Sequence, residues 1–194
     1  ISYQWQRNEV NIGDATEQTY TLTQNDVGSI ISVNATYKDN YGTAENPIES
    51  MALEVINVND APTISNKPAT SVIEDKTYEF TPIVIDIDGD GDTHRFSIKN
   101  KPVWAEFDSN TGYLSGKPDN YDVGETENIV MSVTDSQGAK VDLKFNIKVI
   151  NVDDPPVLTD IPNVRMREDD TEFVNVFVND IDDDDKDIKL SATT

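Results

Sequence analysis

The chain has 194 residues and carries 37 Asp and Glu against 15 Lys and Arg, a formal net charge of −22, with no cysteine. Such a charge repels the phosphates of nucleic acids and of anionic lipids, so neither is expected as a partner. The lack of cysteine excludes disulfides and thiolate metal sites, and no apolar run is long enough to cross a membrane. So many carboxylates need cations to offset their repulsion, and hard divalent ions with oxygen ligands suit that need.

Alternating apolar residues predict strands along the chain. Residues 31–37 and 51–55 place an apolar side chain at every second position, which is the period of a half-buried strand. Further strands are expected near 78–85, 94–99, 113–115 and 128–134, and residues 140–149 alternate throughout, as in an antiparallel strand. Turn residues separate these segments at 40–42, 89–91, 110–112 and 136–138. No segment has a helical period, so the expected fold is all-β, with tandem β-sandwiches.

An internal repeat links two parts of the chain. Residues 55–62 (VINVNDAP) and 149–156 (VINVDDPP) align with an offset of 149 − 55 = 94, and 55–100 share 16 identities in 46 pairs with 149–194. Asp26-Val27-Gly28 also matches Asp122-Val123-Gly124, with an offset of 96. The repeating unit is therefore close to 95 residues, a size typical of a two-sheet sandwich.

The phase of this repeat predicts three domains: residues 1–58 as the C-terminal part of one, 59–151 as a complete one, and 152–194 as the N-terminal part of a third. A partial domain is not expected to bury a full core by itself. We expect the chain to be a segment of a longer protein. The alternative is that partial domains of two molecules complete each other head to tail. Pro62, Pro155 and Pro156 stiffen the linkers, which favours domains arranged end to end.

Acidic and amide residues gather at the expected domain junctions. Calcium takes six to eight oxygen ligands, so a linker and the loops beside it can share one ion. Without an ion, carboxylates held this close would repel each other. The predicted ligands of Ca²⁺ at the first junction are Asn57, Asn59, Asp60, Asp86, Asp88 and Asp135, and at the second they are Asn151, Asp153, Asp154, Asp180 and Asp182. Glu74, early in the middle domain, is a further predicted ligand that could reach the bottom of that domain.

Residues 59–154 resemble a cadherin-type repeat, and in particular the dystroglycan-type cadherin-like modules of large bacterial surface proteins. The resemblance rests on the early acidic motif at 72–75, Asp86-Ile87-Asp88, the loop at 134–138, the linker at 57–62 and the stretch 102–118. It implies an Ig-like Greek-key sandwich with calcium at its junctions. The animal family's Asp-Arg-Glu motif is absent, and each linker is one residue shorter than the animal pattern, which leaves the number of ions per junction open.

Residues 1–58 are similar to a bacterial Ig-like repeat of giant repeats-in-toxin adhesins. The matching segments are 2–5 (SYQW), 19–23 (TYTLT), 26–28 (DVG) and 37–39 (YKD). The two resemblances together cover nearly the whole chain. They imply a secreted protein at the bacterial cell surface.

Three motifs have a second interpretation. Asp86-x-Asp88-x-Asp90-Gly91 matches the start of an EF-hand loop, but Ser97 stands where that loop needs Glu, so an EF-hand is not expected. The single histidine, His94, has no Cys or Ser-His-Asp pattern around it and is expected to be structural. Trp104 lies between apolar residues and is expected to pack in the core and not to stack on a sugar.

The chain is therefore expected to be a non-catalytic extender of an adhesin, with calcium locking each junction into a semi-rigid rod. One rival is a calcium-dependent carbohydrate-binding module of a secreted polysaccharide-processing protein. Another is homophilic cell-cell adhesion. The expected partners are calcium ions and neighbouring repeats, with glycan or homophilic contacts as options and no membrane insertion of this segment.

Overall fold

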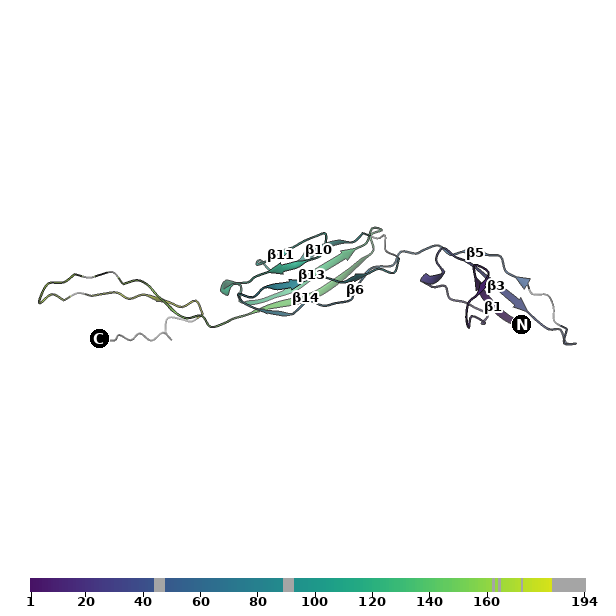
Figure 1. Cartoon of the computed structure of the whole chain (residues 1–194), viewed down its shortest axis with the longest axis horizontal. Helices are drawn as coiled ribbons and strands as arrows, with labels where there is room; N and C mark the ends of the chain where they lie inside the picture. The colour runs from purple at the N-terminus through teal and green to yellow at the C-terminus, as the bar shows by residue number, and fades with distance from the viewer. Residues whose placement is uncertain (44–47, 89–92, 162, 164, 172, 183–194) are drawn as a thin grey trace. The chain divides into compact units, whose positions relative to one another are not determined.

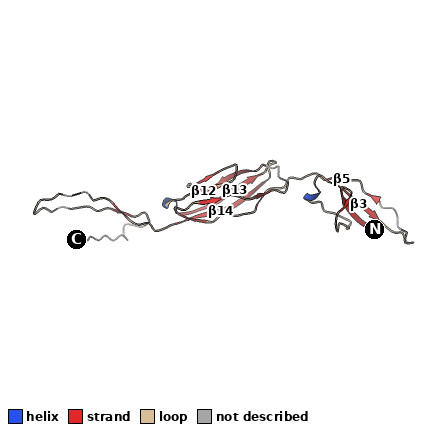
Figure 2. Cartoon of the chain, viewed as in Figure 1, coloured by secondary structure: helices blue, strands red, loops and turns tan. Residues whose placement is uncertain are grey.

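The computed structural model describes residues 1–43, 48–88, 93–161, 163, 165–171 and 173–182 (Figure 1). Strands and loops make up nearly all of this part, which confirms the all-β prediction (Figure 2). Two three-residue 3-10 helices, η1 (Gln24–Asp26) and η2 (Asn120–Asp122), were not expected. Asp90 and Gly91 of the EF-hand-like motif, and the acidic run at 183–185, lie outside the described residues.

The chain divides into two compact units, and the division passes through two long strands. One unit contains Ile1–Thr63, Val84–His94 and Val133–Val141. The other contains Ile64–Ile83, Arg95–Ser132 and Asp142–Thr194. Each of the two linker regions, with the acidic residues predicted beside it, falls within a single unit.

The first unit begins with an antiparallel sheet of five strands, β1 (Ser2–Arg7), β2 (Val10–Asn11), β3 (Ile30–Thr36), β4 (Ile48–Glu49) and β5 (Leu53–Glu54). Their order is β2-β1-β3-β4, and β5 also pairs with β3. Trp5 lies opposite Val33 in this sheet, and its ring lies 5.7 Å from that of Tyr20. The strand predicted at 51–55 is shorter than expected, and Leu53 is two-thirds exposed.

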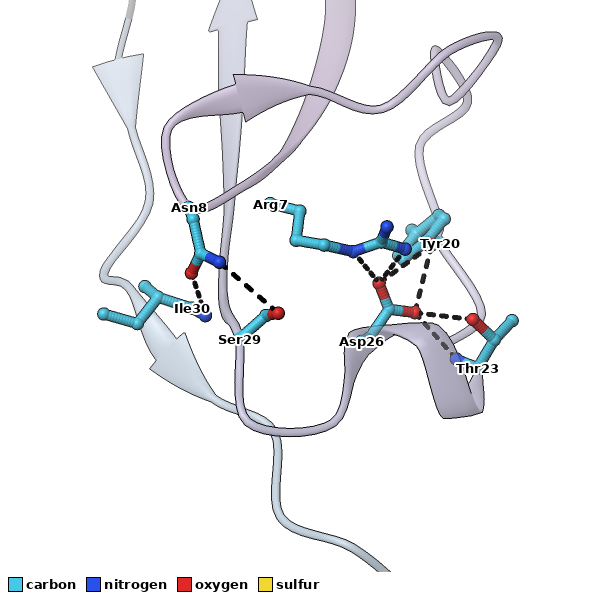
Figure 3. Close-up of polar contacts among 7 residues, drawn as sticks. All are labelled: Arg7, Asn8, Tyr20, Thr23, Asp26, Ser29 and Ile30. Carbon is cyan, nitrogen blue, oxygen red and sulfur yellow. Dashed lines mark hydrogen bonds and ion pairs between the residues drawn. The ribbon is translucent and has the colours of Figure 1, made fainter. Parts of the chain in front are cut away.

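A buried carboxylate, Asp26, fixes the turn at η1 (Figure 3). It accepts hydrogen bonds from Arg7 Nη2 at 2.6 Å and from the backbone N–H of Thr23 at 2.7 Å. The hydroxyls of Thr23 and Tyr20 donate to it as well. Burial raises the pKa of Asp26, but these donors outweigh burial and hold it below the usual value. The turn is therefore stabilised by the ionised form of a single side chain.

Replacing Asp26 with Asn tests this network. We expect Asp26→Asn to destabilise the first unit by on the order of 3 kcal/mol, because Arg7 loses its buried partner. Since the folded pKa lies below the unfolded value of about 3.9, the stabilisation is present above that pH and is lost as the pH falls through the folded pKa. Urea unfolding between pH 2 and 7 should show less acid sensitivity in the variant, and an unchanged acid limb would contradict the assignment.

The second unit holds most of a sandwich. One sheet has the order β10-β13-β14-β7 and the other β11-β12-β8, while β6 pairs with β9. The strands of these two sheets are β7 (Ser71–Ile73), β8 (Tyr78–Phe80), β10 (Arg95–Lys99), β11 (Ala105–Phe107), β12 (Leu114–Gly116), β13 (Gly124–Thr134) and β14 (Lys140–Ile150), and the end of β13 and the start of β14 fall in the first unit. Of the pair β6 (Thr63–Ile64) and β9 (Val84–Ile85), only Ile64 belongs to the second unit. β14 pairs with β7 in parallel, which the alternation at 140–149 did not predict because it reports a buried face and not a strand direction.

The two sheets share one hydrophobic core. Leu114 of β12 is fully buried with Ile129 and Met131 of β13 and Ile147 of β14. Trp104 packs against this cluster, with its ring edge-on to Tyr78 at 5.8 Å. The core role predicted for Trp104 is thus confirmed, as is the alternation along β14.

The C-terminal segment repeats the start of the sandwich. β15 (Val157–Leu158) pairs antiparallel with β16 (Val178–Asn179). Each residue of this pair lies 94 positions after its counterpart in β6 or β9, since 157 − 63 = 94 and 178 − 84 = 94. The sequence repeat is therefore also a structural repeat.

The core makes a quantitative prediction for the second unit. Leu114→Ala removes a fully buried side chain and should cost about 2–5 kcal/mol of unfolding free energy. Val103→Ala, at a position that is 92% exposed, should change it by less than about 0.5 kcal/mol. Urea denaturation of both variants measures the difference, and similar values for the two would contradict the core assignment.

Candidate functional site

The first linker is tied to the loop that follows β9. Asp88 accepts a hydrogen bond from Asn57 Nδ2 at 2.9 Å and one from the backbone N–H of Asp60 at 2.6 Å. Asp86 Oδ1 accepts from the backbone N–H of Asp88, and its Oδ2 lies 3.3 Å from His94 Nε2. The Asp-x-Asp motif thus fixes both the linker and its own loop.

Asp135 joins the same linker from the turn between β13 and β14. Its Oδ1 accepts from the backbone N–H groups of Gln137 and Ala139, and its Oδ2 accepts from Asn59 Nδ2 at 2.9 Å. Burial raises the pKa of Asp135, but Asn59 and the amides of the turn hold it below the usual value. Asp39, 96 residues earlier, accepts from Tyr41 and Thr43 in the same pattern, so the turn is part of the repeat.

At the second linker, three carboxylates come together. Ligand oxygens of Glu74, Asp154 and Asp182 all lie within 4.8 Å of one another. Glu74 follows β7 directly and is 3% exposed, and its backbone N–H donates to Ile150 O. Like charges at this separation repel, and the repulsion grows as water is removed. Among the described residues no equally tight carboxylate group forms at the first linker.

Backbone and amide donors partly offset this repulsion. Glu74 Oε1 accepts from the backbone N–H of Val152, and Asp182 Oδ2 accepts from the backbone N–H of Asp154. Asp182 Oδ1 accepts from Asn120 Nδ2 at 2.5 Å. The Asp154 amide, followed by the amide side chains, holds the pKa of Asp182 below its usual value. Asp182 therefore remains a carboxylate near neutral pH.

The two linkers share one hydrogen-bond pattern. The bond from Asp60 to Asp88 recurs 94 residues later from Asp154 to Asp182. The bond from the Asp88 amide to Asp86 recurs from the Asp182 amide to Asp180, at 3.1 Å in both places. The sequence repeat thus reproduces the arrangement of the acids and not only their number.

Two buried oxygens in these clusters have no hydrogen-bond partner within the described part of the chain. They are Glu74 Oε2 at the second linker and Asn59 Oδ1 at the first. An unpaired buried acceptor is costly, and a carboxylate oxygen more so than a neutral one. The donor set consists of carboxylate and amide oxygens, which is what hard cations such as Ca²⁺ bind. The residues present therefore fit a divalent cation.

The structure also brings in two amides that the sequence did not single out. Gln24 and Asn120 lie 96 residues apart at the first positions of η1 and η2, and each donates to a linker asparagine, Asn57 or Asn151. Because the two residues occupy the same position in the repeat, the sequence could have identified them as a pair. Asp153 is exposed and lies outside the carboxylate cluster.

The contact between Asn59 and Asp135 can be tested with two substitutions. Asn59→Ala only removes a donor, whereas Asn59→Asp places a second carboxylate against Asp135 and turns a hydrogen bond into repulsion. In EDTA at pH 7 we expect the melting temperature to fall further for Asn59→Asp than for Asn59→Ala. Equal losses in differential scanning calorimetry would show that the contact does not contribute.

Within the described residues, no helix is long and apolar enough to cross a membrane. No curated protein matches the sequence. Residues 61–150 match the family model described as "Putative Ig domain", which supports the predicted Ig-like and cadherin-like resemblance.

Solved structures with similar folds include protocadherin gamma B7 domains 1–4 (TM-score 0.49, 15% identity, 93% of this chain and 48% of that one). For mouse cadherin-23 repeats EC22–24 the TM-score is 0.46 and the identity 18%, and the match covers 77% of this chain and 53% of that one. For a "putative alpha-galactosidase" from Bacteroides fragilis the TM-score is 0.38 and the identity 18%, and the match covers 49% of this chain and 19% of that one. This chain thus spans about a fifth to a half of the length of these proteins, and scores below 0.5 carry no conclusion about function. Residues 61–150 of the chain thus match the Ig-domain model and fold as a β-sandwich, as the Ig-like resemblance implied.

Proposed function

We propose that the chain is a non-catalytic extender segment of a bacterial cell-surface adhesin, stiffened by calcium at its domain junctions. The observation that carries the proposal is the cluster of Glu74, Asp154 and Asp182, in which one buried carboxylate oxygen has no partner in the described part of the chain. An Ig-like domain that repeats along a chain suits a spacer, because each unit adds length without adding a catalytic cleft.

Calcium is the cation that the donor set favours. Both linkers offer only oxygen donors from carboxylates and amides, with neither thiolate nor clustered imidazole, which sets the site apart from those of zinc or copper. The first site would use Asn57, Asn59, Asp60, Asp86, Asp88 and Asp135, and the second Glu74, Asn151, Asp153, Asp154, Asp180 and Asp182. Extracellular modules bind calcium with Kd of about 10⁻⁴–10⁻³ M, so the sites would be filled where calcium is abundant.

The mechanism is mechanical. At the second linker the proposed ligands come from the linker and from segments on both sides of it in sequence, and at the first they come from the linker and from segments that follow it. In both cases an ion bound to the linker residues would restrain the backbone torsions of the linker. The existing hydrogen bonds to Asp88 and Asp182 already hold the linker in place at these two points. Binding would replace carboxylate repulsion with attraction and would convert a hinge into a stiff connection. A row of such junctions would project a distal binding domain away from the cell.

Removing calcium and then restoring it tests whether the ion stiffens the junctions. With free calcium at about 100 times Kd, binding should stabilise the folded state by about 2.7 kcal/mol per site. EDTA should therefore lower the melting temperature, and it should reduce the radius of gyration in small-angle X-ray scattering because flexible junctions sample bent conformations; calcium should restore both. A chain that is indifferent to chelation in both measurements would rule out the lock.

Glu74→Gln isolates the second site. The variant keeps an acceptor for the Val152 amide and removes only the charge, so the fold should remain intact. We expect at least a tenfold loss of calcium affinity at one class of site in isothermal titration calorimetry. Glu106→Gln makes the same charge change at an exposed position on β11 and should leave calcium affinity unchanged. Equal losses of calcium affinity in the two variants would show that calcium binds to a diffuse acidic surface and not to a defined site.

A further inference from the structure

Cations gather on the outer face of one sheet of the sandwich, although the chain as a whole is strongly acidic. Arg95 and Lys99 lie on β10, and Lys144 and Lys148 lie on β14 of the same sheet, and all four are exposed. None of them forms an ion pair with another described residue. Four of the 15 basic residues of a chain with net charge −22 therefore lie on one sheet without an ion pair to another described residue.

A groove of about 700 Å³ crosses this face. Its lining combines ammonium, hydroxyl and amide groups, and its one large apolar side chain, Phe145, is partly buried against the core. The lining residues are Thr70, Ser71, Glu125, Asn128, Val130, Lys144, Phe145, Asn146 and Lys148.

The centre of the groove is held by Asn146. Its Oδ1 accepts from the backbone N–H of Asn128, and its Nδ2 donates to Glu125 Oε1, both at 3.0 Å. Asn128 has a positive φ of 56°, which interrupts the regular path of β13 at this point. Glu125 is thereby engaged by an amide, while Lys144 and Lys148 lie on either side of Asn146 along the outward face of β14.

Lys144 and Lys148 are four residues apart on one strand, so their Cα atoms are separated by about 13 Å. Two cations at this spacing, with hydroxyl and amide groups in the same lining, suit an extended ligand that carries repeated carboxylates and many hydroxyls. The geometry points to a binding site for an acidic, uronate-type polysaccharide in this groove, which we call the lysine groove. This activity is separate from the calcium sites, because none of the proposed calcium ligands lines the groove.

A protein partner fits the lysine groove less well. Protein interfaces place aromatic and apolar side chains at their centre and are depleted of lysine. Here the centre holds amide groups and the carboxylate of Glu125, with an ammonium group on either side, and no exposed aromatic residue lines it. A second copy of the chain could supply acidic groups, and self-association is therefore measured beside polysaccharide binding.

The probe is a decamer of galacturonate, with a neutral dextran of similar length as its control. Titration calorimetry is done in EDTA, so that calcium cannot bridge the sugar carboxylates to the acidic linkers. We expect the wild-type chain to bind the galacturonate and not the dextran, with affinity that falls as salt rises. Lys144→Gln/Lys148→Gln should weaken binding at least tenfold. Lys67→Gln/Lys76→Gln, an equal charge change at exposed positions outside the groove, should weaken it less than threefold.

Four outcomes would overturn the proposal: no binding by the wild-type chain, equal binding of dextran, or equal losses in the two double variants. The fourth is a self-association in sedimentation velocity that the groove variant abolishes while galacturonate binding persists, which would make this face an interface between copies. The substituted residues Lys144, Lys148, Lys67 and Lys76 are all exposed. Both double variants should therefore fold, and circular dichroism melting checks this.

Discussion

Repulsion among carboxylates at the linkers is the constraint on which the rest of this structure depends. Three of them share a space of less than 5 Å at the second linker, and several more surround the first. The chain limits the cost with backbone amides and asparagine side chains, which donate to Asp88, Asp135 and Asp182. Donors of this kind stabilise an anion without neutralising it. The remaining negative charge is what makes these sites suited to a cation.

The sandwich supplies the rigid support for these clusters. Glu74 follows β7, whose parallel pairing with β14 places it beside the end of that strand and the linker that continues from it. Asp135 sits in the turn between β13 and β14, where two backbone amides orient its carboxylate. Strand ends and tight turns move less than free loops, so the ligand oxygens are held near one another before any ion arrives. Such pre-organisation lowers the entropy cost of binding.

The sheet that contains β13 and β14 carries exposed acidic side chains, such as Glu125 and Asp142, as well as lysines. Glu79 and Glu106 are exposed on the sheet that contains β8 and β11, whereas the lysine groove crosses the other sheet. In a chain of this net charge, two lysines in one groove do not serve solubility, because additional carboxylates would do so equally well. Extension through the linkers and contact through a sheet face are compatible roles, since they use different surfaces of the same domain.

The sequence alone determined the strands near 31–37, 94–99, 113–115, 128–134 and 140–149, the 94-residue repeat and the identity of the acids at each linker, because these depend on local patterns of burial, turn chemistry and spacing. The single strand expected near 78–85 is two short strands, β8 and β9, in different sheets. It also placed Trp104 in the core from its apolar neighbours. Tertiary structure decided that Glu74, 80 residues before Asp154, joins it and Asp182 in one cluster, and that Asn120 and Gln24 reach the linker asparagines. It also decided the parallel β7–β14 pairing and the gathering of the lysines around one groove. These features depend on which strands lie side by side, and the period of a strand reports which face is buried but not which neighbour it pairs with.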